Sequence, residues 1–362
     1  MSKIEWTGKT WNPVVGCSIV SPGCTNCYAM KMAARLERML PPGNHYAGLT
    51  KKVNGNAVWT GKLALAPEKT LTEPLRVKKP TTWFVNSMGD LFHEDVPDAW
   101  IDKVFAVMAL CPQHTFQVLT KRSKRMREYC QSDVGLRVQN CIDYWDAEDS
   151  FPSEKWETTP WVRNNFPLPN VWLGVSAEDQ TRADERIQDL LATPAAVRFV
   201  SAEPLLGPID FTSLRNVDLG EGQRWLNAIG TRGSGCVYEG GDTCSVPRLD
   251  WIIVGGESGP DARPMHPDWA RSIRDQCKTA GVAFLFKQWG EWCPGENCDY
   301  PAIRSERVAS LFGNTWDYAT LTPRQSEEMH IDDAPDLYRA GKARAGRLLD
   351  GIEHNSMPEA LT

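Results

Sequence analysis

The sequence predicts an α/β protein built as a full or partial (β/α) barrel, and three observations support this prediction. Short apolar runs typical of strands alternate with helix-like segments, which is the pattern of a parallel sheet. At least six such units follow one another along the chain. In each unit a polar or charged cluster stands at the carboxyl end of the strand, where (β/α) barrels collect their active sites.

The individual elements follow from the spacing of apolar residues. A strand is predicted where an apolar run ends in a polar cluster, and a helix where apolar residues recur every three or four positions. No G-x-G-x-x-G turn follows any predicted strand, which argues against a dinucleotide-binding sheet. The predicted strands cover residues 82–85, 115–119, 171–175, 198–200, 250–254 and 282–286, and the predicted helices cover about 98–111, 186–191 and 267–278.

Two stretches interrupt this alternation. Residues 130–170 contain Trp among acidic and Pro residues and are expected to be irregular, whereas residues 211–249 are rich in Gly. We expect a barrel domain over 1–293 with insertions near 130–170 and 211–249. A C-terminal extension over 294–362 shows weak apolar periodicity, with one predicted helix around 336–349.

Composition narrows the class of protein. The chain has 362 residues, of which 41% are hydrophobic and 24% charged, as is ordinary for a soluble globular protein. No window approaches 18 consecutive apolar residues, and the N-terminus lacks the apolar stretch of a signal peptide. We therefore expect a cytoplasmic protein without a membrane partner, and a monomer. With a net charge of −6, any binding to nucleic acid needs a local positive patch.

Three of the eleven cysteines form a motif. Cys17, Cys24 and Cys27 are spaced C-x6-C-x2-C on a loop that contains Gly and Pro, just before a predicted helix. Three thiolates on one loop can hold a four-iron cluster and leave the fourth iron open. A structural zinc site is the alternative, but it needs a fourth ligand, and no Cys or His occurs in the ten residues after Cys27. Chance clustering of buried thiols is a third explanation.

The motif also carries a resemblance. Asn12-Pro13-x-x-Gly16-Cys17 with Gly23-Cys24-x-x-Cys27-Tyr-Ala resembles the cluster loop of radical SAM enzymes, and is most similar to their spore photoproduct lyase-like branch. The common spacing there is C-x3-C-x2-C, so three further residues separate the first two cysteines here. From about residue 6 to 292 the chain also resembles a phage-associated family that shares its Ser-Ala-Glu-Pro, Gly-Gly-Glu-Ser-Gly and Lys-Gln-Trp-Gly strand ends.

The resemblance implies a specific fold and chemistry. The fold would be a partial (β/α)6 TIM-like barrel with inserted loops. Cys17, Cys24 and Cys27 would hold a [4Fe-4S] cluster, and S-adenosyl-L-methionine would bind the open iron. An electron from a donor such as flavodoxin or ferredoxin would then give a 5′-deoxyadenosyl radical, which abstracts hydrogen from the substrate. The resemblance names no catalytic side chain of this sequence.

Polar residues at several strand ends are candidates for binding this cofactor. A Glu in such a place is commonly a cap or a member of a surface ion pair, so no single residue decides the matter. Several polar clusters at the same end of a barrel are harder to explain in that way. The candidates are Asn86, Ser87, Asp90, Ser176, Glu178, Ser201, Glu203 and Glu257.

A basic segment suggests the substrate. Five of the seven residues in 121–127 are Lys or Arg, which makes this the densest positive stretch. Phosphates are its obvious target, and the spore photoproduct lyase resemblance points to a DNA base, reached by flipping or in a single strand. The chemistry would be lesion repair or rearrangement of a modified pyrimidine. The candidate substrate residues are Lys121, Arg122, Lys124, Arg125, Lys287 and Gln288.

Other functions remain open at this point. Residues 121–127 could equally be the solvated face of a barrel helix, and the substrate could be a peptide or a small metabolite. A non-enzymatic binding module stabilised by zinc is the alternative from another class. Four further cysteines, Cys236, Cys244, Cys293 and Cys298, could form a second metal site or could be free thiols in loops.

Overall fold

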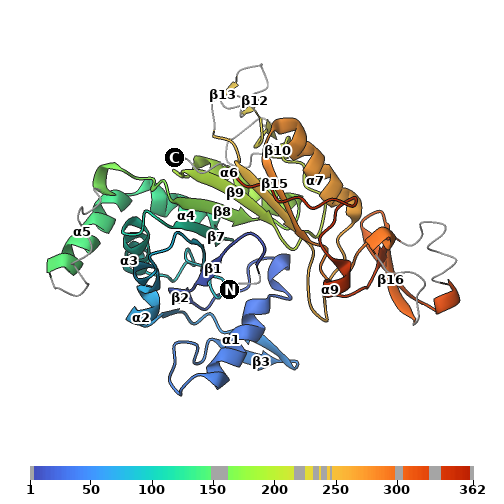
Figure 1. Cartoon of the computed structure of the whole chain (residues 1–362), viewed down its shortest axis with the longest axis horizontal. Helices are drawn as coiled ribbons and strands as arrows, with labels where there is room; N and C mark the ends of the chain where they lie inside the picture. Colours follow the sequence, from blue (N-terminus) through green and yellow to red (C-terminus); the bar gives the residue numbers. More distant parts are fainter. Residues whose placement is uncertain are drawn as a thin grey trace. The chain divides into compact units, whose positions relative to one another are not determined.

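The computed structural model describes residues 4–147, 162–215, 225–230, 236–237, 243–244, 247–297, 305–325 and 336–358 (Figure 1). Its main feature is a seven-stranded sheet whose strands are hydrogen-bonded in their order along the chain. A doubly wound sheet would instead reverse its order at a switch point. The prediction of an α/β fold with a parallel, half-barrel sheet is therefore confirmed. The strands are β1 (Lys9–Trp11), β6 (Thr82–Val85), β7 (Thr115–Thr120), β8 (Val171–Ser176), β9 (Val197–Ala202), β14 (Trp251–Gly255) and β15 (Ala283–Gln288).

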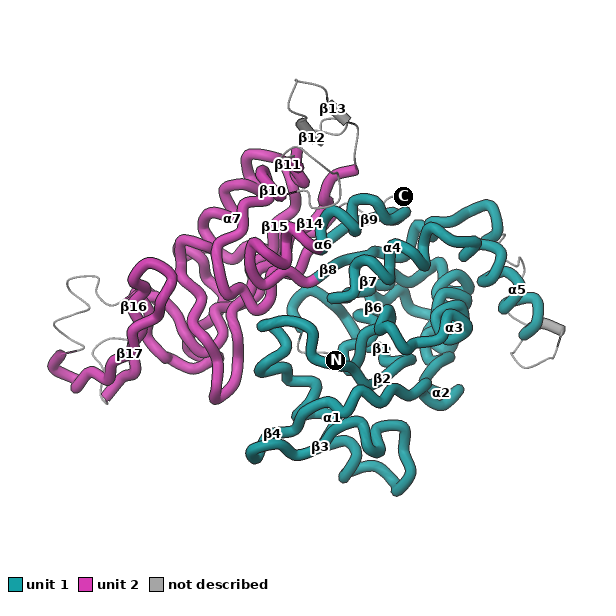
Figure 2. The backbone as a smooth tube through the Cα atoms, turned by 180° about the vertical axis from the view of Figure 1, so that it is seen from behind, with its two compact units in different colours: residues 1–175, 186–199, 360–362 teal, residues 176–185, 200–359 magenta. Residues whose placement is uncertain are grey.

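The chain divides into two compact units, coloured separately in Figure 2. Unit 1 comprises residues 1–175, 186–199 and 360–362, and unit 2 comprises residues 176–185 and 200–359. The domain boundary predicted after residue 293 stays a prediction. The C-terminal extension beyond that residue belongs to unit 2 except at its last three positions.

Unit 1 is built on buried parallel strands. β6 pairs with both β1 and β7, and β7 pairs with β8, all in parallel, with Val85 opposite Val118. Every residue of β8 is buried, as expected of a strand covered on both faces. The helix α3 (Asp98–Ala109) supplies much of this core, since eight of its residues are buried, and Asp98 stands in its first turn, where a negative charge is favourable.

The other elements of unit 1 lie before β6 and around α3. The segment between β1 and β6 carries the cysteine loop and a helix packed on a hairpin, whereas the segments after β7 are helical. The elements are β2 (Val14–Val15), η1 (Pro22–Cys24), α1 (Tyr28–Met39), β3 (Thr50–Val53), β4 (Asn56–Trp59), β5 (Ala64–Leu65), α2 (Glu68–Leu71), η2 (Glu73–Arg76), α4 (Ser123–Gln131), α5 (Val134–Ala147) and η4 (Val162–Asn164). The helix α6 (Gln180–Ala192) is shared between the two units.

Unit 2 contains the last two strands of the main sheet and two smaller sheets. β14 pairs in parallel with β15, and the helix α7 (Pro267–Ala280) connects them. The ends of α7 are well defined, because His266 accepts a hydrogen bond from Asp268 N and Gly281 takes a left-handed conformation with φ 63°. The remaining elements are β10 (Leu214–Arg215), β11 (Trp225–Leu226), β12 (Cys236–Val237), β13 (Thr243–Cys244), η5 (Gly295–Asn297), β16 (Glu306–Phe312), β17 (Thr315–Leu321), β18 (Leu337–Tyr338) and α9 (Lys342–Ala345).

Two sequence predictions about local structure are wrong. Residues 130–170 were expected to be irregular, but residues 134–147 form the helix α5. A helix was expected around 336–349, but residues 337–338 form the strand β18, and α9 is only four residues long. Gly341 and Gly346 flank α9 with φ of 84° and 67°, so neither end can continue as a right-handed helix.

Across the described ranges, the structure contains no helix with the length and apolar character needed to cross a bilayer.

Candidate functional site

The cysteine motif lies on the loop between β2 and α1 in unit 1. Cys17 and Cys27 are half-buried, and Cys24 is buried at the end of η1. Cys27 occupies the position that caps the N-terminus of α1, so the predicted helix after the motif is confirmed. Peptide N–H groups at a helix N-terminus favour a negatively charged thiolate there.

Two glycines hold the start of this loop against the turn after β6. Gly16 has φ 97°, and a Cβ atom on it would lie 2.2 Å from the carbonyl oxygen of Lys62. A Cβ atom on Gly89 would lie 2.9 Å from the carbonyl oxygen of Gly16. The two backbones form a parallel bridge at these glycines. A side chain on Gly89 would push them apart, whereas one on Gly16 would clash with the backbone of Lys62.

Asn12, the first residue of the sequence motif, joins the cysteine loop to the loop after β6. Its Oδ1 atom accepts hydrogen bonds from Ser87 Oγ at 3.1 Å and from Met88 N at 2.9 Å. In return, Asn86 Oδ1 accepts a hydrogen bond from Val14 N at 3.3 Å. The loop with the cysteines and the loop after β6 are therefore joined by side chains from both.

Two of the predicted cofactor-binding residues, Ser87 and Asn86, differ in whether their side chains keep a free hydrogen-bonding group. The hydroxyl of Ser87 is already bonded to Asn12. Asn86 has φ 60°, and its Nδ2 atom is buried without a hydrogen-bond partner among the described residues. An unpaired buried N–H donor is costly unless a ligand or water accepts from it. Asn86 is thus the predicted residue that retains a free donor beside the cysteine loop.

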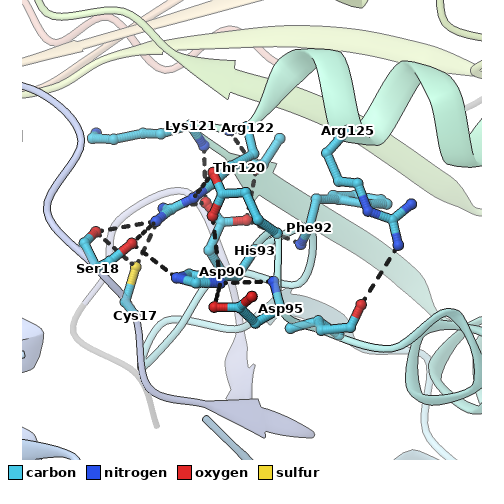
Figure 3. Close-up of polar contacts among 12 residues, drawn as sticks. Cys17, Ser18, Asp90, Phe92, His93, Asp95, Thr120, Lys121, Arg122 and Arg125 are labelled. Carbon is cyan, nitrogen blue, oxygen red and sulfur yellow. Dashed lines mark hydrogen bonds and ion pairs between the residues drawn. The ribbon is translucent and has the colours of Figure 1, made fainter. Parts of the chain in front are cut away.

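Asp90, the third predicted residue in this loop, is occupied by internal contacts (Figure 3). Its Oδ1 atom accepts from Thr120 Oγ1 at 2.6 Å and from Phe92 N at 3.1 Å. Its Oδ2 atom accepts from Lys121 N at 3.0 Å and forms an ion pair with Arg122 at 3.2 Å. Asp90 therefore organises the end of β7 and has no oxygen atom left without a partner.

Arg122 connects this carboxylate to the cysteine loop. Figure 3 shows its guanidinium group facing Cys17 and Ser18. The Nη1 atom lies 3.3 Å from Cys17 Sγ, and Nη2 donates to Ser18 O at 3.1 Å and to Ser18 Oγ at 2.8 Å. The Arg122 side chain is only 4% exposed. It was predicted to contact phosphate, and this contact stays a prediction; in the structure the guanidinium group is engaged by Asp90, Cys17 and Ser18.

His93 also belongs to the hydrogen-bonded network around Arg122. Ser18 Oγ lies 2.8 Å from His93 Nε2, and Asp95 N donates to His93 Nδ1 at 3.2 Å. Burial, followed by the nearby charge of Arg122, lowers the pKa of the His93 imidazole. Asn12, Ser18 and His93 were not among the predicted site residues. Asn12 was within the motif, and the polar triplet His93-Glu94-Asp95 after the β6 loop was a signal that could have identified His93.

Cys24 lies close enough to the other two thiols of the motif to influence them electrostatically. Burial, followed by the Asp90 carboxylate, raises the pKa of Cys17 to about 12, although the charge of Arg122 and its hydrogen bond act in the opposite direction. Burial also raises the pKa of Cys27, against backbone hydrogen bonds from the start of α1 and the charge of Lys121. Cys24 acts on both of these thiols as a like charge. All three thiols therefore share one neighbourhood, with Arg122 and Lys121 as its cations.

The donor atoms suit a thiolate-bound metal centre, but their positions do not yet form one. Thiolates are the ligands of iron–sulfur clusters, and the N–H groups and cations around them would offset their negative charge. Within the described ranges, however, no three His, Cys, Asp or Glu side chains converge as a metal-holding group. The residue types fit the cluster, whereas the present sulfur positions do not.

The basic segment 121–127 is largely neutralised by neighbouring carboxylates. Arg125 forms an ion pair with Asp98, and Arg127 with Asp189 at 2.8 Å. Arg122 is paired with Asp90, so Lys121 and Lys124 are the basic residues of this segment that lack a carboxylate partner among the described residues. The charge of Lys121 also lowers the pKa of Cys27. The dense positive patch that the sequence suggests is thus reduced to two lysines.

A second polar group lies in unit 2, at the ends of β9, β14 and β15. Glu203 Oε1 is 3.0 Å from Lys287 Nζ, and Ser201 Oγ donates to Glu203 Oε2 at 3.1 Å. A Cβ atom on Gly255 would lie 2.3 Å from Glu203 Oε1, so this carboxylate passes directly over the strand. Three of the predicted residues, Ser201, Glu203 and Lys287, are therefore brought together.

The other predicted residues of unit 2 have different surroundings. Glu257 is held by Arg263, whose Nε atom donates to Glu257 Oε2 at 2.9 Å. Gln288 Nε2 donates to Ser258 Oγ at 3.1 Å, and Gln288 Oε1 is buried with no partner in the described part of the chain. Ser176 and Glu178 are buried.

The cysteines outside the motif are only partly described. Cys293 is buried, and its backbone pairs with that of Tyr338. Cys236 and Cys244 are opposite one another in the β12–β13 register, and Cys298 lies outside the described residues. A second metal site at these four positions stays a prediction.

Comparison with known proteins gives one match. A family model described as a protein of unknown function (DUF5131) matches residues 1–358. No curated protein and no solved structure matches the chain. The matched range includes the cysteine loop as well as the polar groups of both units.

Proposed function

The chain belongs to the DUF5131 family, and we propose that it is a radical S-adenosylmethionine enzyme that acts on a nucleic-acid base. The proposal includes the (β/α)6 form of the partial barrel and a cytoplasmic location, where thiols remain reduced. The single observation that carries it is the C-x6-C-x2-C loop, whose first cysteine is tied to the end of β7 by Arg122 and Asp90.

Each residue of the cysteine site has a proposed role. Cys17, Cys24 and Cys27 hold the [4Fe-4S] cluster. Once reduced by an external electron donor, the bound cluster would supply the chemistry for reductive cleavage of S-adenosylmethionine. Arg122 and Lys121 offset the negative charge of the thiolates. Asn86 Nδ2 is the buried donor available to a carboxylate of the cofactor.

The residues that hold the cysteine loop in place are consistent with a metal-binding role for this loop. Asn12, Gly16 and Gly89 fix the cysteine loop to the turn after β6 through backbone and side-chain contacts. Sites of this kind need ligands held by surrounding hydrogen bonds, because small displacements of a ligand change metal affinity. A zinc-stabilised binding module would use the same loop only as a structural element, and it stays the alternative.

Anaerobic reconstitution with iron and sulfide tests the proposal. Wild-type protein should gain absorbance near about 400 nm, as thiolate-bound iron–sulfur clusters do. After addition of dithionite and S-adenosylmethionine it should release 5′-deoxyadenosine. Cys17→Ala, Cys24→Ala and Cys27→Ala should each abolish cluster assembly and keep the fold, whereas the matched control Cys141→Ala, a half-buried cysteine on α5, should assemble normally.

Metal analysis separates the two candidates. Roughly one tightly bound zinc and no iron in intact protein would contradict the proposal and favour the binding module. Loss of cooperative thermal unfolding in all three cysteine variants would point the same way, because removing a structural zinc ligand unfolds the region around it.

A further inference from the structure

The segment between the cysteine loop and β5 carries an excess of positive charge. Residues 28–62 contain six Lys or Arg side chains and a single acidic residue, Glu37, in a chain whose net charge is −6. The segment forms α1 and the β3–β4 hairpin, which lie side by side at one end of unit 1 (Figure 2). Charge segregation of this degree marks a surface for an anionic partner.

Four of these cations are exposed and have no carboxylate partner among the described residues. Arg35 and Arg38 lie on α1, and Lys51 and Lys52 lie on β3. Arg35 Nε contacts Met39 Sδ at 3.3 Å, and Arg38 Nε donates to the carbonyl of Ala34 at 3.1 Å, so neither guanidinium is neutralised. We call these four residues the α1–β3 cations. They contrast with Arg122, Arg125 and Arg127, which are all paired with Asp.

Apolar side chains are exposed between these cations. Tyr28, Met32 and Met39 are 55%, 38% and 65% exposed, and they follow one another on α1 at spacings that place them on one face. Aromatic and apolar side chains among Lys and Arg are the usual composition of surfaces that bind single-stranded nucleic acid.

This surface is joined to the cysteine loop by a shared core. The inner face of α1 packs with the hairpin, and Cys17 and Cys27 pack against the same hydrophobic cluster. A nucleic-acid strand bound on α1 and β3 would therefore be held at a fixed position relative to the cysteines. The cluster comprises Val15, Ala29, Met30, Ala33, Tyr46, Leu49, Trp59 and Met88.

We propose that the α1–β3 cations form a phosphate-binding surface for single-stranded nucleic acid. An acidic protein would be the other anionic partner, but protein interfaces are depleted in Lys, and half of these cations are Lys on a two-stranded hairpin. The inference rests on the proposed function for the class of substrate, but binding at this surface needs no cluster. It replaces the segment 121–127 as the main contact with nucleic acid.

Fluorescence anisotropy with a labelled 20-nucleotide single-stranded DNA of mixed sequence tests this surface, with the full-length protein at several salt concentrations. Three matched double variants are compared, and none of their six lysines has a carboxylate partner within the described ranges. Lys51→Ala/Lys52→Ala removes two of the α1–β3 cations. Lys78→Ala/Lys79→Ala removes an exposed pair elsewhere in unit 1, and Lys121→Ala/Lys124→Ala removes what is left of the basic segment.

The salt dependence gives the decisive result. Each phosphate contact to a single strand contributes about 0.7 to the slope of log affinity against log salt, so the first pair should reduce the slope by about 1.4. Adding Arg35→Ala and Arg38→Ala should double that reduction and weaken binding at least about tenfold at 50 mM salt. The Lys78/Lys79 and Lys121/Lys124 pairs should change the slope by less than about 0.5.

Three outcomes would overturn the inference. They are an unchanged slope in the four-site variant, an equal loss in either control pair, and binding of labelled polyglutamate by a protein that does not bind the DNA. Circular dichroism of each variant verifies that it is folded. Failure of cluster reconstitution with intact DNA binding would remove only the radical chemistry, and the reverse result would remove only this surface.

Discussion

Replacing Arg122 tests whether the cysteine loop is anchored as the structure indicates. Arg122→Met removes the ion pair with Asp90 and the contacts to Cys17 and Ser18 while keeping an unbranched side chain of similar length. Both side chains of the pair are almost fully buried, at 4% and 6% exposed. Removing one partner of a buried pair costs about 3–5 kcal/mol, because the other charge is left without compensation.

The surroundings of Asp90 place the expected loss at the lower end of that range. Its carboxylate keeps three hydrogen-bond donors, namely Thr120 Oγ1 and the backbone N–H groups of Phe92 and Lys121. We therefore expect Arg122→Met to lower the free energy of unfolding by about 3 kcal/mol. Urea denaturation followed by circular dichroism measures this loss.

A matched control lies three residues further along the chain. Arg125 also pairs with an Asp, but the Arg125 and Asp98 side chains are 24% and 48% exposed. Arg125→Met should cost no more than about 1 kcal/mol. Asp90→Asn combined with Arg122→Met should cost less than the sum of the single losses by at least about 1.5 kcal/mol. Equal losses in the two Arg variants, or additive losses at Asp90 and Arg122, would refute the reasoning.

Three further predictions concern other parts of the molecule. Gly16→Ala should destabilise the protein by about 1–3 kcal/mol more than Gly61→Ala, because both glycines have positive φ but only Gly16 meets backbone at 2.2 Å; urea midpoints measure this. If Glu203 binds S-adenosylmethionine, Glu203→Gln should weaken binding about tenfold in equilibrium dialysis with unchanged iron content, since a charge-assisted hydrogen bond contributes about 1.5–3 kcal/mol; full affinity would argue against this role. Burial lowers the pKa of His114 from its usual 6.5, so the unfolded state binds the proton more tightly and stability falls as pH drops below that value. Urea midpoints at pH 7.5 and 5.5 should therefore differ less in His114→Gln than in the wild type, and an equal difference would show that His114 does not contribute.

Much of the local structure could be predicted from the sequence, because apolar spacing is a local property of the chain. The predicted strands at 82–85 and 115–119 and the helix at 267–278 agree with β6, β7 and α7 to within two residues at each end. The helix α5 was missed although Val134, Val138 and Ile142 recur every four residues and are all buried. Acidic and Pro residues around it suggested a loop and hid that signal.

The cysteine motif is also a local property, and the sequence alone identified it. Its spacing on a loop before a helix needed no tertiary information. What supports it did need such information, since Asp90 and Arg122 are 73 and 105 residues from Cys17 and reach it only because β6 and β7 are neighbours in the sheet.

The tertiary structure decides which of the chain's charged side chains remain available to a partner. The sequence counts five basic residues in 121–127 but cannot show that Asp90, Asp98 and Asp189 neutralise three of them. Residues 28–62 are less densely basic, yet the α1–β3 cations meet no carboxylate among the residues that the structure describes. The number of charges is fixed by the sequence, whereas their availability depends on ion pairs between segments that only folding brings together.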